Sequence, residues 1–130
     1  MYTVAAIIFR RNFNLESLLQ RTFRELKQSG LQLGGLIQTG NGPASCATEV
    51  DLVDLRTDKT FVILEDRGQC ASGCRLRESG LADASQALEE AITDQVDLLI
   101  INRFGRAESH GRGLLDYFAK AIEHKVPILT

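Results

Sequence analysis

The fold of this chain is decided by residues 97–108, which read Asp97-Leu98-Leu99-Ile100-Ile101-Asn102-Arg103-Phe104-Gly105-Arg106-Ala107-Glu108. The short apolar run at its start is typical of a strand that is buried on both faces of a parallel sheet. It leads directly into a charged, glycine-containing loop from Asn102 to Gly113. Because ligands of open α/β sheets bind just beyond the carboxyl ends of such strands, this loop is the first place to look for a binding site.

Upstream, residues 2–9 (YTVAAIIF) are β-branched and apolar on both faces, which predicts a central parallel strand. Between Leu15 and Leu26, apolar residues recur at three- and four-residue spacing, which predicts an amphipathic helix packed on the sheet. Asn12 or Asn14 is suited to cap this helix, and Gly30 is placed to end it.

The remaining patterns alternate between strands and helices. Residues 33–39 predict a second strand, residues 50–55 and 60–64 an antiparallel hairpin with a four-residue turn, and residues 66–74 a polar loop. Ser79 is suited to cap a helix whose apolar face comprises Leu81, Ala84, Leu88, Ala91 and Ile92. Residues 113–124 predict a further helix, and residues 126–130 a final core strand.

This order predicts a three-layer α/β sandwich around a mostly parallel sheet that includes an antiparallel hairpin. With 130 residues, 44% of them hydrophobic, residues 1–130 are sized for one globular domain. The last strand pattern is followed by no turn, helix or polar tail, so we expect the polypeptide to be truncated at Thr130.

Composition excludes several classes of partner. The net charge of −2 is spread along the chain with both signs, which argues against nucleic acid and against an anionic membrane surface. No apolar run approaches the roughly 18 residues of a membrane-spanning helix. The first nine residues lack the basic start of a secretory signal, so we expect a cytoplasmic protein without membrane insertion.

Six blocks of this sequence resemble an uncharacterised bacterial family that is typically encoded beside molybdate-transport genes. The blocks are residues 4–8, 34–38, 51–57, 73–76, 102–108 and 111–113. More distantly, the chain is similar to small P-loop nucleoside triphosphatases, in which an Asp-Glu pair, a Gly and a later Glu stand at the positions of Asn102, Arg103, Gly105 and Glu108. The resemblance implies a P-loop-like fold and a role in molybdenum uptake or cofactor supply, although a fold alone does not carry activity.

The segment after the first strand lacks the parts of a P-loop. A P-loop uses glycines to wrap backbone N–H groups around phosphates, a Lys to reach the β- and γ-phosphates, and a hydroxyl to hold Mg²⁺. Residues 10–17 (RRNFNLES) contain no Gly, no Lys and no matching hydroxyl. The sequence therefore predicts degenerate Walker motifs and no ATP or GTP hydrolysis, and it assigns no catalytic residue.

What remains is a candidate anion site between the first-strand loop and the loop after residue 101. Arginine suits oxyanions because its planar guanidinium donates two parallel hydrogen bonds. The candidate ligand-binding residues are Arg10, Arg11, Asn102, Arg103, Gly105, Arg106, Glu108, Gly111, Arg112 and Gly113. The alternative interpretation is structural, with solvated arginines or arginines paired to acids such as Glu16 and Glu108.

The three cysteines, Cys46, Cys70 and Cys74, are an odd number in a chain without an export signal, which argues against structural disulfides. Cys70 and Cys74 have a CxxxC spacing, which differs from the CxxC spacing of common redox and zinc motifs. The three cysteines could supply three thiolates to a metal ion, and His110 could be a fourth ligand, only if all these residues converge in the fold. No metal site is assigned.

Three functional hypotheses follow. The first is a non-hydrolysing ligand-binding or regulatory protein that holds a nucleotide fragment or a small oxyanion such as molybdate. The second is a nucleoside triphosphatase or phosphotransfer enzyme with unconventional residues, in which Glu108 is the one obvious acid of the loop. The third is a thiol-dependent metal carrier. The cofactor and the oligomeric state stay open.

Overall fold

The computed structural model describes residues 4–10, 12–40, 50–66, 74–76, 78–102, 109, 111 and 114–130. Its elements, in chain order, are β1 (Val4–Ala5), α1 (Leu15–Gln28), β2 (Leu33–Gly40), β3 (Val50–Asp54), β4 (Thr60–Asp66), β5 (Cys74–Leu76), α2 (Glu78–Thr93), β6 (Leu98–Ile101), α4 (Leu115–Glu123) and β7 (Ile128–Leu129).

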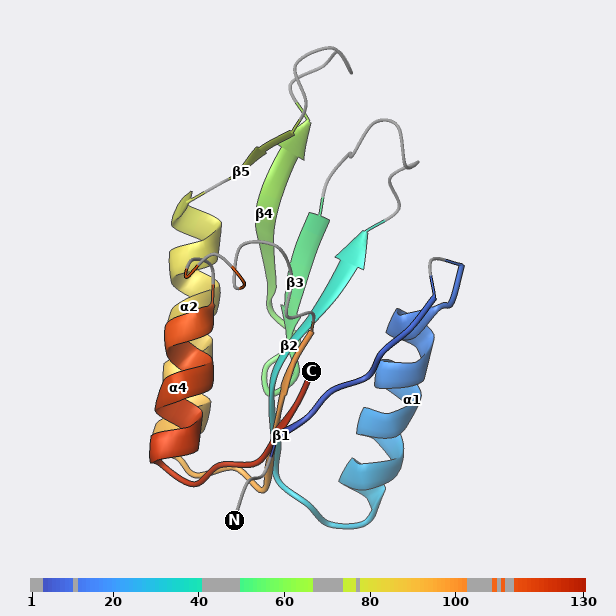
Figure 1. Cartoon of the computed structure of the whole chain (residues 1–130), viewed down its shortest axis with the longest axis vertical. Coiled ribbons are helices and arrows are strands. Elements are labelled where there is room, and N and C mark those ends of the chain that lie inside the picture. The colour runs from blue at the N-terminus through green and yellow to red at the C-terminus, as the bar shows by residue number, and fades with distance from the viewer. Residues whose placement is uncertain are drawn as a thin grey trace.

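The described strands form one mixed sheet in the order β1-β7-β6-β2-β3-β4-β5. The first four strands in this order are parallel to one another, whereas β3, β4 and β5 are each antiparallel to the preceding strand. Helix α1 covers one face of the sheet, and α2 and α4 lie side by side on the other (Figure 1). The predicted three-layer α/β sandwich with an antiparallel hairpin is therefore confirmed.

Strand β6 lies inside the described sheet, between β7 and β2, and it is buried as its apolar run predicts. Leu99, Ile100 and Ile101 are fully buried. Leu99 and Ile101 belong to the core beneath α2 and α4, whereas Ile100 belongs to the smaller core beneath α1. Strand β6 thus fixes the position of Asn102, the residue that follows it.

The helices bury the faces that their periodicity predicts. In α2, Ala84, Leu88, Ala91 and Ile92 are completely buried in the larger core, and Leu81 packs against that core. In α1, Leu15 and Leu19 are buried, the Asn14 side chain caps the helix, and Gly30 follows it with a φ of +88°. Of the described residues, none forms a helix long and apolar enough to cross a membrane.

The structure corrects three details. Strand β1 lies at an edge of the described sheet rather than at its centre, because its one neighbour is β7 and an apolar pattern does not encode strand order. Strand β5 pairs with β4 at the end of the segment predicted as a polar loop. Ser79 lies inside α2, which begins at Glu78, rather than capping it.

Candidate functional site

The parallel strands β1, β7, β6 and β2 all end at the same edge of the sheet, which we call the carboxyl edge. Arg10 follows β1, Thr130 follows β7, and Asn102 follows β6. Helix α1 begins at this edge, beside the end of β2 (Figure 1). The carboxyl edge is where open α/β sheets bind ligands, so it is the first candidate site.

Asn102 is the most informative residue at this edge. The residue is only 7% exposed, and its backbone N–H donates to the carbonyl oxygen of Leu36 on β2 at 3.0 Å. Among the residues that the structure describes, no group donates a hydrogen bond to the side-chain Oδ1. A buried polar atom that is left without a hydrogen-bond partner costs about 1–3 kcal/mol, so this oxygen calls for a functional explanation.

Two further buried oxygens at the same edge have no partner among the described residues. They are Oγ1 of Thr130 and Oδ1 of Asp51, which lies on β3 directly opposite Thr39 near the end of β2. With the Asn102 oxygen, these are the buried side-chain polar atoms without a hydrogen-bond partner in the part of the chain that the structure describes. Unused hydrogen-bonding capacity is therefore concentrated where the parallel strands end, as it would be in a site that awaits a polar ligand.

Two backbone N–H groups at the start of α1 already donate hydrogen bonds to acceptors within the chain. The N–H of Ser17 donates to Asn14 Oδ1 at 3.1 Å, and the N–H of Leu15 donates to the carbonyl oxygen of Phe13 at 3.0 Å. In a P-loop, the corresponding N–H groups point at phosphates. The helix dipole still favours an anion here, but these two N–H groups do not form a phosphate cradle.

The structure places only part of the predicted anion site. Arg10 is exposed at the carboxyl edge, and Asn102 is buried at the same edge. Gly111 has a φ of +76°, a backbone conformation that glycine adopts without strain. The other candidates lie outside the described residues, namely Arg11, Arg103, Gly105, Arg106, Glu108, Arg112 and Gly113.

The cysteine hypothesis also falls largely on residues that are not described. Cys46, Cys70 and His110 lie outside the described residues, and Cys74 begins β5. Within the described part of the chain, no group of three or more His, Cys, Asp or Glu side chains is arranged to hold a metal ion. The thiol-dependent carrier stays an untested hypothesis.

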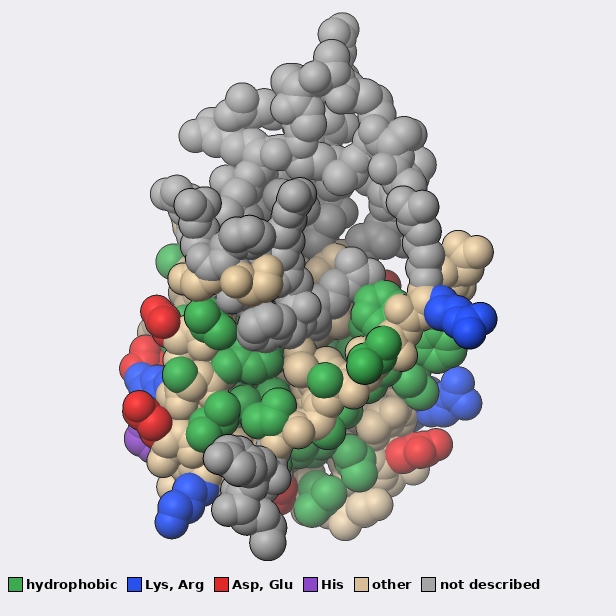
Figure 2. All heavy atoms as spheres, viewed as in Figure 1, with side chains coloured by type: hydrophobic (Ala, Val, Ile, Leu, Met, Phe, Trp, Pro, Cys, Tyr) green, Lys and Arg blue, Asp and Glu red, His purple; other side chains and the backbone are tan. Residues whose placement is uncertain are grey.

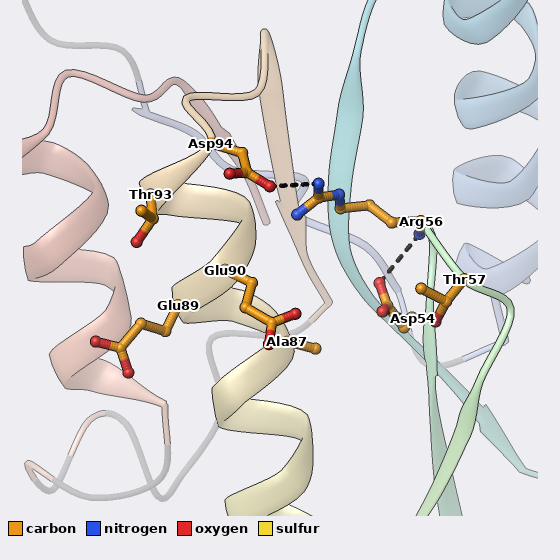
Figure 3. A pocket seen from close by; sticks show the side chains of 8 residues that line it. All are labelled: Asp54, Arg56, Thr57, Ala87, Glu89, Glu90, Thr93 and Asp94. Atoms are coloured by element: carbon orange, nitrogen blue, oxygen red, sulfur yellow. Dashed lines mark hydrogen bonds and ion pairs between the residues drawn. The ribbon is translucent and has the colours of Figure 1, made fainter.

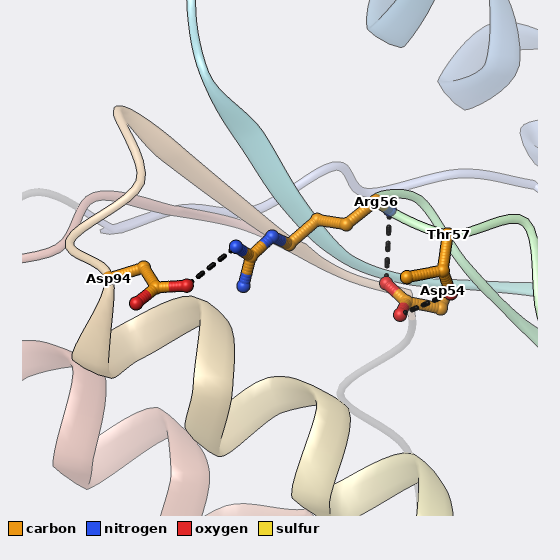
Figure 4. A network of polar contacts seen from close by, with 4 residues as sticks. All are labelled: Asp54, Arg56, Thr57 and Asp94. Atoms are coloured by element: carbon orange, nitrogen blue, oxygen red, sulfur yellow. Dashed lines mark hydrogen bonds and ion pairs between the residues drawn. The ribbon is translucent and has the colours of Figure 1, made fainter.

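A polar network lies at the opposite edge of the sheet, in the turn between β3 and β4 (Figure 4). The buried carboxylate of Asp54 accepts hydrogen bonds from the N–H of Arg56 at 3.0 Å and from Thr57 Oγ1 at 2.8 Å. The Arg56 guanidinium reaches across to the Asp94 carboxylate after α2, at 2.6 Å. Sequence patterns did not single out this network, although an Asp three residues before a Thr in a hairpin turn is a recognisable local signal.

This network borders a cavity between the hairpin turn and α2 (Figure 3). Half of its eight lining residues are acidic, namely Asp54, Glu89, Glu90 and Asp94. Because both carboxylate oxygens of Asp54 are satisfied locally, this residue holds the turn and is not left free for a ligand. The cavity therefore carries less functional information than the unpaired groups at the carboxyl edge.

The chain belongs to the DUF2478 family, described as a protein of unknown function, whose model matches residues 4–130. Membership of an uncharacterised family is thereby confirmed. The chain is 39% identical over 128 residues to the molybdenum import ATP-binding protein ModC 2 of Bradyrhizobium diazoefficiens. That alignment covers 98% of this chain but 14% of the relative, so this chain spans about a seventh of that protein's length.

The fold is similar to the solution structure of a human cancer-related nucleoside triphosphatase, with a TM-score of 0.71. The superposition covers 98% of this chain and 73% of that one. The two sequences are 13% identical, so the likeness concerns the fold alone. It confirms the expected nucleoside-triphosphatase-like architecture.

Proposed function

We propose that this protein binds a nucleotide or a small oxyanion at the carboxyl edge of its parallel strands and does not hydrolyse nucleoside triphosphates. The observation that carries the proposal is the buried Asn102 at the end of β6, whose side-chain oxygen has no partner among the described residues. An Asn amide presents both an acceptor and an NH₂ donor: its NH₂ group can donate to an anion, and its oxygen can accept from an N–H or O–H group of a nucleotide. Arg10 supplies positive charge at the same edge.

The absence of hydrolysis rests on both sequence and local geometry. Residues 10–17 contain neither the glycines nor the Lys of a P-loop, and Asn102 stands where the resemblance to small P-loop nucleoside triphosphatases implies an acid. In addition, the Ser17 and Leu15 N–H groups donate to groups of the chain itself. A site of this kind can bind an anion through side chains, but it lacks the parts that hold Mg²⁺ and the transferred phosphoryl group.

A link to molybdenum is part of the same proposal. The curated relative is named as an ATP-binding protein of molybdenum import, and a region of it is 39% identical to this chain. Molybdate is a small oxyanion of the kind that arginine side chains bind through paired hydrogen bonds. We therefore propose a regulatory or ligand-binding role in molybdenum uptake or cofactor supply, in the cytoplasm, with Arg11, Arg103, Gly105, Arg106, Glu108, Gly111, Arg112 and Gly113 completing the site.

The first prediction concerns turnover. Purified protein incubated with Mg²⁺ and either ATP or GTP is expected to release no phosphate above the protein-free rate, because the catalytic parts are missing. Continuous phosphate-release measurements test this. Turnover that disappears in Glu108→Gln would show that the chain is an enzyme and would overturn the proposal.

The second prediction separates binding from stability at Asn102. Asn102→Leu is expected to weaken anion binding about tenfold or more, since a hydrogen bond to a charged group is worth about 1.5–3 kcal/mol. The same substitution removes a buried side-chain oxygen that has no partner among the described residues, so the free energy of unfolding is expected to stay the same or to rise. Calorimetry and denaturant titration measure the two effects.

Arg10→Ala and Arg56→Ala form a matched pair for the same measurement. Arg10 lies at the carboxyl edge, whereas Arg56 is at the opposite edge and paired with Asp94. Loss of affinity in Arg10→Ala with unchanged affinity in Arg56→Ala would locate the site at the carboxyl edge. Equal losses would instead indicate a general effect of positive charge.

A further inference from the structure

Two of the buried oxygens without a partner among the described residues, those of Asn102 and Asp51, lie on the same face of the sheet. The N–H of Asn102 donates to Leu36 and continues the ladder of β6, so its side chain shares the α1 face with Ile100. Asp51 stands two residues before Val53, which lines a cavity beneath α1, so Asp51 belongs to that face as well.

The two side chains stand on either side of β2. Asn102 follows Ile101, which pairs with Leu36 of β2, whereas Asp51 pairs with Thr39. Their backbones are therefore two strand spacings apart across the sheet and two residues apart along it, about 12 Å in total. One tetrahedral oxyanion cannot touch both side chains, so a ligand that uses both must be longer than phosphate or molybdate.

Both oxygens are hydrogen-bond acceptors. The Oδ1 of Asn102 is an amide oxygen, and a carboxylate such as that of Asp51 accepts hydrogen bonds but donates none. A fully ionised oxyanion also only accepts, and the charge of Asp51 repels it. A ligand that pairs with Asp51 must therefore present an N–H or O–H donor.

Charge changes sign along the carboxyl edge. The exposed Arg10 follows β1, and α1 begins near the end of β6, because Leu15 and Ile100 share one core. The N-terminus of a helix favours negative charge, and Figure 2 shows Lys and Arg side chains on the α1 side of the molecule. The carboxylate of Asp51 lies beyond β2. The edge therefore suits a ligand with an anionic end toward β6 and α1 and a donor end toward Asp51.

The backbone is irregular at the same residue. Asp51 pairs with Val62 of β4, but Val50 pairs with Leu64, so Ile63 is an extra residue in β4. Such a β-bulge bends the strand and changes the direction of nearby side chains, and bulges are frequent beside active sites. The bulge is a second, independent feature that distinguishes Asp51 from the rest of β3.

We propose that Asp51 selects a nucleotide over a bare oxyanion, by accepting hydrogen bonds from the nucleoside part while the phosphates lie toward Asn102 and α1. The inference rests on the proposed function and narrows its ligand. A nucleotide joins phosphates to ribose hydroxyls and, in adenine, guanine and cytosine, to an exocyclic amine. It therefore supplies the length, the negative end and the donors together. Acidic side chains accept from ribose hydroxyls in the same way in dinucleotide-binding sheets.

The test is calorimetric titration of the whole chain with ATP, GTP, inorganic triphosphate and molybdate. Inorganic triphosphate has the phosphate chain of ATP without the ribose and the base. ATP or GTP is expected to bind at least about tenfold more tightly than inorganic triphosphate or molybdate, the effect of one hydrogen bond to a charged group. In Asp51→Leu this advantage is expected to disappear, while the affinity for inorganic triphosphate stays the same or rises.

Two further variants separate the acceptor from the charge. Asp51→Asn keeps a neutral acceptor and almost the same shape, so its nucleotide affinity is expected to lie between those of wild type and Asp51→Leu. Asp58→Asn is the matched control. It removes the same charge from an exposed residue in the turn between β3 and β4, where asparagine tolerates the φ of +60°, and it is expected to bind nucleotide like wild type.

The outcomes distinguish this inference from the function on which it rests. If none of the four ligands binds, the proposed function and the inference are both wrong. If inorganic triphosphate or molybdate binds as tightly as both nucleotides, or if Asp51→Leu and Asp51→Asn bind nucleotide like wild type, the proposed function stands and the inference is wrong. Equal losses of ATP and inorganic triphosphate affinity in Asp51→Leu would make Asp51 a structural residue and would also overturn it.

Discussion

Gly35→Ala is expected to lower the free energy of unfolding by more than about 4 kcal/mol, which is most of the stability of many domains. Gly35 lies on β2 opposite Ile100 of β6 and has a φ of +119°. A methyl group at this position would lie 1.9 Å from the carbonyl oxygen of Ile100, which is impossible without moving a strand. Strand β6 cannot shift to make room, since its own residues Leu99 and Ile101 are fully buried in the core. Denaturant unfolding followed by circular dichroism measures the loss.

Gly30→Ala is the matched control for this prediction. Gly30 also has a positive φ, of +88°, but no atom lies within 4 Å of the position that a methyl group would occupy. Its substitution costs the backbone strain alone, about 1–2 kcal/mol. If Gly35→Ala were no more destabilising than Gly30→Ala, the result would contradict the close contact between β2 and β6 at Gly35.

Leu88→Ala is expected to destabilise the protein by about 2–5 kcal/mol, the range for a leucine removed from a packed core. Leu88 is completely buried where α2 packs on the sheet, and it belongs to the same core as Leu36 and Phe118. Alanine is a good helix former, so the loss reports packing rather than helix propensity. The midpoint of urea unfolding, with the slope checked for constancy, gives the free energy.

Leu31→Ala serves as the comparison, because the Leu31 side chain is already 40% exposed. It is expected to cost about 1 kcal/mol or less. Equal losses at Leu31 and Leu88 would contradict the assigned core.

Most of the fold could be predicted from local patterns. The periodicity of α2 predicts the buried face through Ala84, Leu88 and Ile92, and the apolar run before Asn102 predicts a buried strand. Both predictions concern which side chains are buried, and the spacing of apolar residues indicates this directly. The order of strands is a long-range property that periodicity does not encode, which is why β1 was expected at the centre and lies at an edge of the sheet that the described residues form.

The candidate site could be predicted only in outline. The end of β6 pointed to Asn102, which the structure finds buried and with a side-chain oxygen that has no partner among the described residues, whereas its role in binding stays a prediction. The unpaired groups of Asp51 and Thr130 could not be foreseen, because they meet this edge through the pairing of distant strands. The Asp54 network was missed for a similar reason, since the Asp94 that Arg56 reaches is 38 residues further along the chain.

The most direct test of the account is a calorimetric titration of the wild-type protein with ATP, with inorganic phosphate and with molybdate, each at low and at high salt. The account predicts that at least one of these anions binds, that its affinity falls at high salt, and that ATP is recovered intact. If none of the three binds at either salt concentration, the carboxyl edge is not an anion site, and the central claim is wrong.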